Sequence, residues 1–384
     1  MILFGPFDRH NLGDLLFAHI ASALLPGREL VVAGLAERDL RPFGGHPVRA
    51  LADVARDWPA GRPATVLHAG GEVLTCSAWQ AAAMLLPPDE AAPTIAHLEH
   101  HPGEQRGWVR RMLQTDALAP YAAARRFFAP GTTVRTGYLG VGGVGLPALP
   151  DEMRAEVLED LRAATVVTVR DRVTLAHLQA SGIRATLLPD PAVMVAELFD
   201  ELIRERPLTG EAARAVAPHP AGFLAVQCSA EFAADASLDA LAQQVNAAAR
   251  AEGLGVVLFR AGAAPWHDDL ATLRRLAERL PAGTATVFES LDVWDICALI
   301  AASRGVLASS LHAQIVAAAF GRPSTHLRSP AAPPGPTKHE AYAQTWASDD
   351  QESEHTLSLQ APRAAGLFRR GFAEVAAALE APSP

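Results

Sequence analysis

Residues 305 to 323 read GVLASSLHAQIVAAAFGRP, and they contain a complete strand, turn and helix. The first four residues are small and apolar, as in a strand buried on both faces of a parallel sheet. Ser309 and Ser310 form the turn, and the alanine-rich segment that follows favours a helix. Gly321 and Pro323 then end that helix. This order of strand, turn and helix is the repeating unit of an α/β protein.

Similar units recur along the chain on both sides of this stretch. Strands are predicted at Met1 to Phe7, Glu29 to Gly34, Thr65 to Gly71, Thr132 to Val141, Thr165 to Val169, Ala185 to Leu188, Phe223 to Gln227, Val256 to Phe259 and Ala285 to Phe288. Residues 206–221 hold three prolines between the two series of strands and are predicted to be a linker. Because parallel strands need helical crossovers over both faces of the sheet, each series predicts a doubly wound domain.

The sequence therefore predicts an α/β protein with two Rossmann-like doubly wound domains that face a cleft. The N-terminal domain is expected at residues 1–205 and the C-terminal domain at residues 222–360. A last helix is expected at residues 362–380. Ligands of such sheets bind at the carboxyl ends of the strands, so polar residues that directly follow strands are the candidates for a site.

Composition excludes several classes of protein. The 384 residues carry a formal net charge of -9, which argues against broad nucleic-acid binding. The three cysteines lie far apart and form no C-x-x-C, so a reducing cytoplasm is expected. The N-terminus lacks the features of a signal peptide, and no charge-free apolar run reaches the ~18 residues of a transmembrane helix.

Two common motifs are only weakly matched. Residues 140–145 fit G-x-G-x-x-G, but the prolines that follow delay the expected helix, so a glycine turn is predicted instead of a dinucleotide site. Residues 97–101 include three histidines and a glutamate. Because Pro93 and Pro102 leave little room for a helix, we expect an exposed polar loop there and no metal site.

The N-terminal series places polar and glycine residues after two of its strands. Asn11, Gly13 and Asp14 lie where the first strand turns into the first helix, and they predict either a ligand contact or an N-cap. The pair Gly70 and Gly71 ends another strand. At the first of these turns, Gly13 would let a ligand approach the backbone closely.

Arg170 directly follows the strand that ends at Val169 and is expected to be exposed there. A guanidinium at a carboxyl strand end is suited to bidentate capture of phosphate or carboxylate. The alternative is a structural ion pair with Asp190.

His312 lies in the first turn of the helix that follows Ser309 and Ser310. The unpaired amides and the positive end of the dipole favour an anion at that helix start. A histidine beside a bound anion can act as a proton donor, and the alternative is a capping role.

These pieces together resemble the polysaccharide pyruvyl transferase family over most of residues 1 to 325. The matching motifs are Asn11-Leu12-Gly13-Asp14, Gly70-Gly71, Val169-Arg170-Asp171-Arg172-Val173-Thr174 with Gly182, Asp190-Pro191-Ala192, and Ser309-Ser310-Leu311-His312-Ala313 through Gly321-Arg322-Pro323. The resemblance implies a GT-B-like fold and transfer of a pyruvyl unit from phosphoenolpyruvate to a saccharide or lipid-linked saccharide as a ketal. It implies a cytoplasmic enzyme of polysaccharide or exopolysaccharide biosynthesis, with phosphoenolpyruvate as co-substrate and neither cofactor nor metal. No transmembrane segment is required, because contact with a lipid-linked acceptor needs only the membrane surface.

The resemblance also implies roles for individual residues. His312 is the expected acid, Arg170 the expected anion clamp, and Asp14 the expected base. Donor-binding residues are expected to be Arg170, Ser309, Ser310, Leu311 and His312. Acceptor-binding residues are expected to be Asn11, Gly13, Asp14, Gly70 and Gly71.

Ser310 departs from the family pattern, which commonly has arginine two residues before the histidine. The serine removes one positive charge from the donor site, and two alternatives follow. One is a nucleotide-sugar glycosyltransferase of the same fold, in which Glu289 would hold a ribose. The other is a degenerate member that binds a saccharide or a partner without catalysis.

Overall fold

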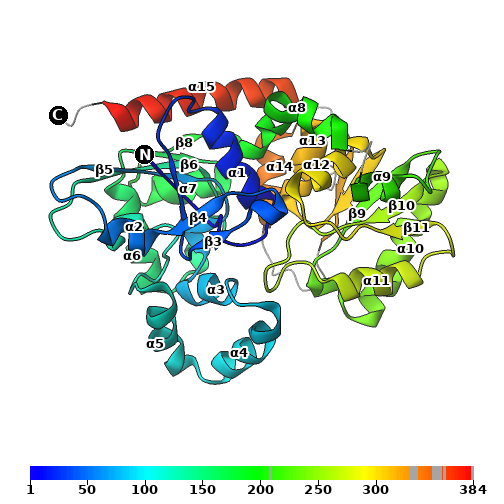
Figure 1. Ribbon diagram of the computed structural model, residues 1–384, viewed down its shortest axis with the longest axis horizontal. Coiled ribbons are helices and arrows are strands. Elements are labelled where there is room, and N and C mark those ends of the chain that lie inside the picture. The colour runs from blue at the N-terminus through cyan, green and yellow to red at the C-terminus, as the bar shows by residue number, and fades with distance from the viewer. Residues whose placement is uncertain (207–209, 329–335, 348–356, 358–359, 382–384) are drawn as a thin grey trace. The chain divides into compact units, whose positions relative to one another are not determined.

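The computed structural model describes residues 1–206, 210–328, 336–347, 357 and 360–381 (Figure 1). These residues pack into two compact units. Unit 1 contains residues 1–9, 14–191 and those from Ala365 onward, whereas unit 2 contains residues 10–13 and 192–364. This division lies upstream of the linker predicted at 206–221. Part of that stretch forms helix α9 (Gly210–Val216), and residues 207–209 lie outside the described residues.

Unit 1 is built on an eight-stranded sheet in the order β3-β4-β2-β1-β5-β6-β7-β8. The strands are β1 (Ile2–Phe4), β2 (Val31–Gly34), β3 (Arg38–Asp39), β4 (Pro47–Ala50), β5 (Ala64–Ala69), β6 (Val134–Val141), β7 (Val166–Val169) and β8 (Thr186–Leu187). All neighbours are parallel except β3 and β4, which pair in antiparallel fashion. The strand order reverses at β1, so the switch point of this sheet lies between β1 and β5.

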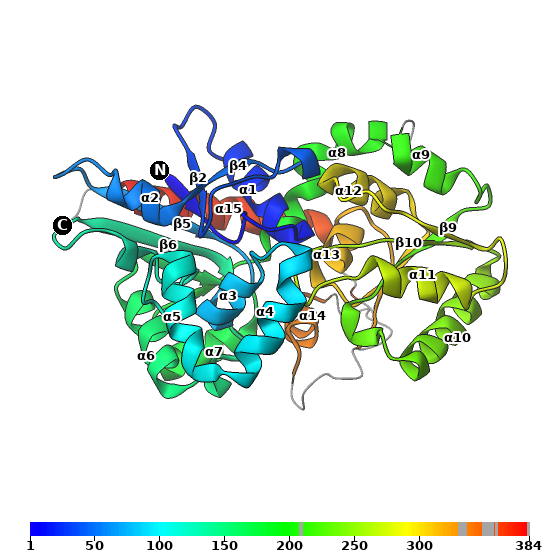
Figure 2. The ribbon, with the colours of Figure 1, turned by 60° about the horizontal axis from the view of Figure 1, so that its bottom comes forward.

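Helices surround this sheet. They are α1 (Leu12–Ala23), α2 (Leu51–Arg56), α3 (Ala78–Ala83), α4 (Pro88–His100), α5 (Pro102–Leu113), α6 (Asp151–Arg162), α7 (Arg172–Ala180) and α15 (Ala361–Glu380). Helices α3, α4 and α5 pack on one another (Figure 2). The end of α15 binds unit 1, because the Arg135 guanidinium on β6 donates to the carbonyl oxygen of Ala378 at 2.7 Å.

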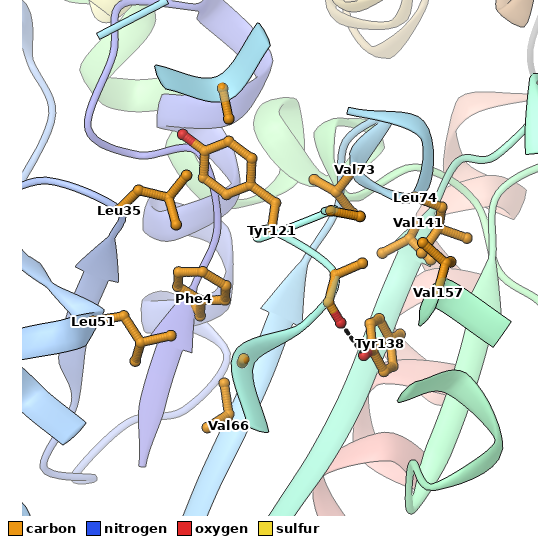
Figure 3. Close-up of a cluster of buried hydrophobic side chains, with 14 of the residues drawn as sticks. Phe4, Leu35, Leu51, Val66, Val73, Leu74, Tyr121, Tyr138, Val141 and Val157 are labelled. Atoms are coloured by element: carbon orange, nitrogen blue, oxygen red, sulfur yellow. Dashed lines mark hydrogen bonds between the residues drawn. The ribbon is translucent and has the colours of Figure 1, made fainter. Parts of the chain in front are cut away.

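One hydrophobic cluster of unit 1 lies against β1, β5 and β6, where apolar side chains from strands and helices meet (Figure 3). Phe4 and Val66 come from neighbouring strands, and both are fully buried. Tyr138 packs in the same cluster with its hydroxyl satisfied, because it donates to the carbonyl oxygen of Ala122 at 2.5 Å. A buried phenol needs such a partner, since an unmade hydrogen bond costs about 1–3 kcal/mol.

Unit 2 is built on a five-stranded parallel sheet in the order β11-β10-β9-β12-β13. Its strands are β9 (Phe223–Gln227), β10 (Gly255–Leu258), β11 (Ala285–Val287), β12 (Gly305–Ala308) and β13 (Ser324–His326). Its helices are α8 (Val195–Glu205), α9, α10 (Asp235–Glu252), α11 (Leu270–Glu278), α12 (Val293–Ala302), α13 (Leu311–Ala319) and α14 (Lys338–Trp346). Helices α10 and α11 cover one face of the sheet, and α8, α9, α12 and α13 cover the other (Figure 2). The switch point lies between β9 and β12.

The loop expected around residues 97–101 is instead helical. Pro88 and Pro102 stand at the first positions of α4 and α5, where a missing N–H costs nothing. Pro102 therefore begins a helix, and Pro93, which was expected to leave no room for one, lies inside α4. His97 and His101 stack with ring centroids 4.4 Å apart. Among the described residues, three or more His, Cys, Asp or Glu side chains nowhere gather as a metal site would require.

Within the described part of the chain, every helix is too short or too polar to cross a bilayer.

Candidate functional site

Arg170 is buried at the carboxyl end of β7, with only 1% of its surface exposed. Its Nη1 donates to Asp190 at 2.9 Å, and its Nη2 donates to Glu72 at 2.7 Å. The expectation of an exposed arginine is therefore wrong, and the structural ion pair with Asp190 is present. Glu72 was not foreseen, because it lies beyond β5 and meets Arg170 only through the fold.

Gly142, the first residue after β6, lies against the ion pair between Arg170 and Glu72. A Cβ at this position would overlap the Glu72 carboxylate and would lie 2.8 Å from Nε of Arg170. The glycine thus leaves room for the ion pair. Helix α6 begins only at Asp151, as the prolines after the motif indicate.

Asp14, Gly70 and Gly71 come together in unit 1, as their positions after β1 and β5 predict. Asp14 is 5% exposed, and a Cβ on Gly71 would lie 3.4 Å from its Oδ1. Both glycines have positive φ, 67° and 85°, which favours glycine over other residues. The backbone of the β5 turn therefore runs close to the predicted base.

Asn11 and Gly13 belong to unit 2, and Gly13 lies beside His312. Asn11 accepts a hydrogen bond from the amide of Gly13 at 3.1 Å, and its backbone forms a bridge with Gly262. A Cβ on Gly13 would overlap the imidazole ring of His312. One residue predicted to bind the acceptor, Gly13, thus contacts the predicted acid.

The turn after β12 is tied to the end of β9. Ser310 caps α13 by accepting from the amide of Ala313, and its own amide donates to Oε1 of Gln227 at 2.8 Å. Ser309 accepts from the amide of Ser229 at 3.0 Å. Since β9 and β12 flank the switch point, these residues lie where doubly wound sheets bind ligands.

The side chains of Leu311 and Glu289, two further candidate site residues, make structural contacts. The side chain of Leu311 is 2% exposed, so it belongs to the core and only its backbone is available to a ligand at the helix start. Glu289 pairs with Arg274 at 2.6 Å on the surface.

Gln227 and Asp268 are polar residues of this edge that the sequence reasoning missed. Asp268 accepts from the amide of Ala261 at 2.6 Å and from Nε2 of Gln227 at 2.7 Å. Burial raises the pKa of Asp268 to about 7, against the opposing effect of these hydrogen bonds. The position of Gln227 at the end of a predicted strand was the signal that could have found it.

The fold is GT-B-like, with two doubly wound α/β units. The UDP-N-acetylglucosamine 2-epimerase of Rickettsia bellii superposes with a TM-score of 0.52 at 9% identity, over 98% of this chain and 95% of that one. The corresponding epimerase of Methanocaldococcus jannaschii gives 0.51 at 9% identity, over 85% and 82% of the two chains. The E. coli ADP-heptose lps heptosyltransferase II gives 0.41 at 16% identity, over 98% of each chain. At such identities, the first two likenesses show the fold alone.

Comparison of sequences identifies the family. The model of the polysaccharide pyruvyl transferase family matches residues 125–329, more than half of the chain. The chain therefore belongs to the polysaccharide pyruvyl transferase family. The matched region includes Arg170 and the turn from Ser309 to His312, whereas residues 11–14 and Gly70-Gly71 lie outside it. No curated protein matches the chain in a comparison of whole sequences.

Proposed function

We propose that this protein transfers a pyruvyl group from phosphoenolpyruvate to a saccharide and forms a ketal. The observation that carries the proposal is the family match over residues 125–329, which spans the unit 2 switch point with His312 in the first turn of α13. An enzyme of this type needs an anion site next to a proton donor. The helix start offers both, because its amides and dipole attract phosphate.

The reaction balances with these groups alone. A proton is added to C3 of phosphoenolpyruvate, and a sugar hydroxyl forms a bond to C2. The C2–O bond to phosphate then breaks as a second hydroxyl bonds to C2, so that one hydroxyl proton replaces the proton given to C3 and the other leaves on phosphate. His312 is the proposed proton donor, and Asp14 is the proposed base for the acceptor hydroxyl.

Binding of the donor is proposed for the turn Ser309 to His312. The Ser310 hydroxyl and the backbone amides of the first turn of α13 offer hydrogen bonds to phosphate. Gly13, which contacts His312, and Asn11, which accepts from the amide of Gly13, are proposed to bind the acceptor. Arg170 is occupied by Glu72 and Asp190, so its proposed role is to fix the ends of β5, β7 and β8.

The test is release of phosphate from phosphoenolpyruvate in the presence of a panel of saccharides, with the ketal detected by mass spectrometry. His312→Asn should bind phosphoenolpyruvate as the wild type does and should lose about 10²–10⁴-fold in turnover, as removal of a general acid does. His177→Asn, on the partly exposed surface of α7, is the matched control. Near-normal turnover by His312→Asn would remove it as the acid, and turnover with a nucleotide sugar alone would replace this function by glycosyl transfer.

A further inference from the structure

Arg9 is a buried cation with unmet hydrogen-bonding capacity. It follows β1 in unit 1, and its side chain is 9% exposed. Within the described residues, its Nε and Nη1 atoms are buried and make no hydrogen bond. A guanidinium stays charged in proteins and has five N–H donors, so burying it without acceptors is costly. Such an orphaned group in a folded protein calls for an explanation.

The neighbouring side chains do not supply the missing acceptors. Asp14 forms a buried ion pair with Arg9, but its Oδ2 lies 3.6 Å from Nε, beyond hydrogen-bond length. Asp8 is engaged elsewhere, because Tyr121 donates to it at 3.0 Å and the amides of Leu35 and Ala36 donate at 2.5 Å and 2.9 Å.

Two further groups surround the guanidinium without neutralising it. Tyr121 places its ring beneath Arg9, with Cζ 5.1 Å from the ring centroid, which holds the cation in place. Burial raises the pKa of the Cys76 thiol, so that it stays neutral and offers only a weak acceptor. A guanidinium that is held against an aromatic ring, with two donor atoms that make no hydrogen bond, is preorganised to bind an anion.

The position of Arg9 agrees with a ligand site. The strand order of the unit 1 sheet reverses between β1 and β5, and Arg9 lies in the loop after β1. The loop after β5 carries Gly70 and Gly71, whose positive φ values favour glycine, and Gly71 lies close to the Asp14 carboxylate. Ligands of doubly wound sheets bind at this edge.

We propose that Arg9 binds the carboxylate or phosphate group of a substrate of this enzyme. The inference rests on the proposed function, because that function offers two sources of the anion: phosphoenolpyruvate, or an acidic or phosphorylated saccharide acceptor. Both present the same oxyanion chemistry to Nε and Nη1. Arg9 would then be the cation that binds substrate in a chain that has serine at position 310.

The experiment measures binding to the full chain by calorimetry and thermal melting. The probes are phosphoenolpyruvate, glucuronic acid and glucose 1-phosphate, with glucose as the neutral reference. At least one of the three anions should bind the wild type, and Arg9→Met should weaken that binding about ten- to 150-fold, the range expected for charge-assisted hydrogen bonds. Arg126→Met is the matched control, because that arginine is already paired with Asp160 and Glu159.

Folding is tested in the same samples. Without ligand, Arg9→Met should melt below the wild type, since the methionine removes the buried ion pair with Asp14 and the contact with the Tyr121 ring, so binding is measured at a temperature at which the variant is folded. If Arg9→Met does not fold, Arg9→Lys keeps the charge and should still weaken binding about tenfold, because an ammonium cannot reproduce the planar set of donors. Unchanged affinity for all anions in the variant that folds, or no binding of any anion to the wild type, overturns the proposal.

The two proposals fail separately. Suppose that glucuronic acid or glucose 1-phosphate binds through Arg9 and that phosphoenolpyruvate is neither bound nor consumed. That result supports the anion site at Arg9 and contradicts pyruvyl transfer. If phosphoenolpyruvate is consumed and the Arg9 variants bind every anion as the wild type does, pyruvyl transfer is supported and the anion site at Arg9 is contradicted. The probe that responds identifies the source of the anion.

Discussion

The Arg170 ion pair predicts the clearest effect of a single residue on stability. Arg170→Ala leaves the fully buried Asp190 carboxylate without its guanidinium partner. Breaking a buried pair from one side costs about 3–5 kcal/mol, because the remaining charge stays desolvated. Urea unfolding should show this loss.

The matched control for Arg170 is Arg154→Ala, which removes a surface pair with Asp151. Surface pairs contribute about 0–1 kcal/mol, so the control should lie near the wild type. An Arg170→Ala protein as stable as that control would mean that the pair is not needed for folding and that Arg170 is available to a ligand.

Asp268 predicts a dependence of stability on pH. An unfolded aspartate loses its proton near pH 4, whereas the pKa of folded Asp268 is about 7. Between these values the folded state binds an extra proton, so this contribution is fully present below about pH 4 and is lost as the pH rises to about 7. The slope is at most about 1.4 kcal/mol per pH unit. Unfolding measured from pH 4.5 to 8 should show it, and Asp268→Asn should lack it; an identical slope in that variant would assign the titration to another group.

At the scale of elements, Gly13 in α1 predicts a loss of turnover without a loss of fold. Gly13→Ala introduces a Cβ that overlaps the His312 ring. Since Gly13 is a helical residue, alanine fits the backbone, and the effect should act through the imidazole. Turnover should fall at least tenfold while the far-UV spectrum is kept. The control is Gly103→Ala in α5, where a Cβ meets nothing within 4 Å, and it should have no effect on turnover. Equal activity of the two variants would show that the contact of Gly13 with His312 does not matter for turnover.

The start of α13 predicts opposite effects on binding and stability. Ser310→Arg restores the cation common in the family but removes the N-cap to Ala313, which costs about 1 kcal/mol. The variant should bind phosphoenolpyruvate more tightly and melt at a lower temperature. Ser310→Ala loses the same cap without gaining charge, so it isolates the capping effect. Weaker binding by Ser310→Arg would show that residue 310 does not face the donor.

Elements with clear local patterns could be predicted from the sequence, and the others could not. Strands with a clear local pattern, such as Phe223–Gln227 and Gly305–Ala308, lie where the sequence predicts them. Two short strands, the edge strand Arg38–Asp39 and its neighbour Pro47–Ala50, have no such pattern, because pairing with neighbouring strands defines them. In the same way, Arg170 was visible as a strand-end residue, but its partner Glu72 is 98 residues away. Contacts of that kind depend on topology, which local patterns do not contain.

At the scale of the whole molecule, unit 2 depends on four residues from the N-terminal region of the chain. The amide of Leu12 donates to Ala261 at 2.7 Å, the amide of Ala263 donates to the His10 carbonyl oxygen at 3.1 Å, and the His10 ring meets the Leu291 carbonyl oxygen at 2.7 Å. A fragment of residues 192–364 should therefore melt lower than the same fragment with residues 10–13 fused to it through a flexible linker. Each restored hydrogen bond is worth about 0.5–1.5 kcal/mol. Identical melting curves would show that residues 10–13 do not stabilise unit 2.

The passage of residues 10–13 into unit 2 also limits how such a protein can diversify. In the described part of the chain, exchange of unit 2 for that of a relative requires breakpoints after Arg9, Gly13, Pro191 and Ala364. A single crossover between two homologous genes would instead combine residues 10–13 of one parent with residues 192–364 of the other. Inheritance of the two units is thereby linked, and new specificities in this lineage are expected to arise by point substitution in loops, with whole-domain shuffling disfavoured.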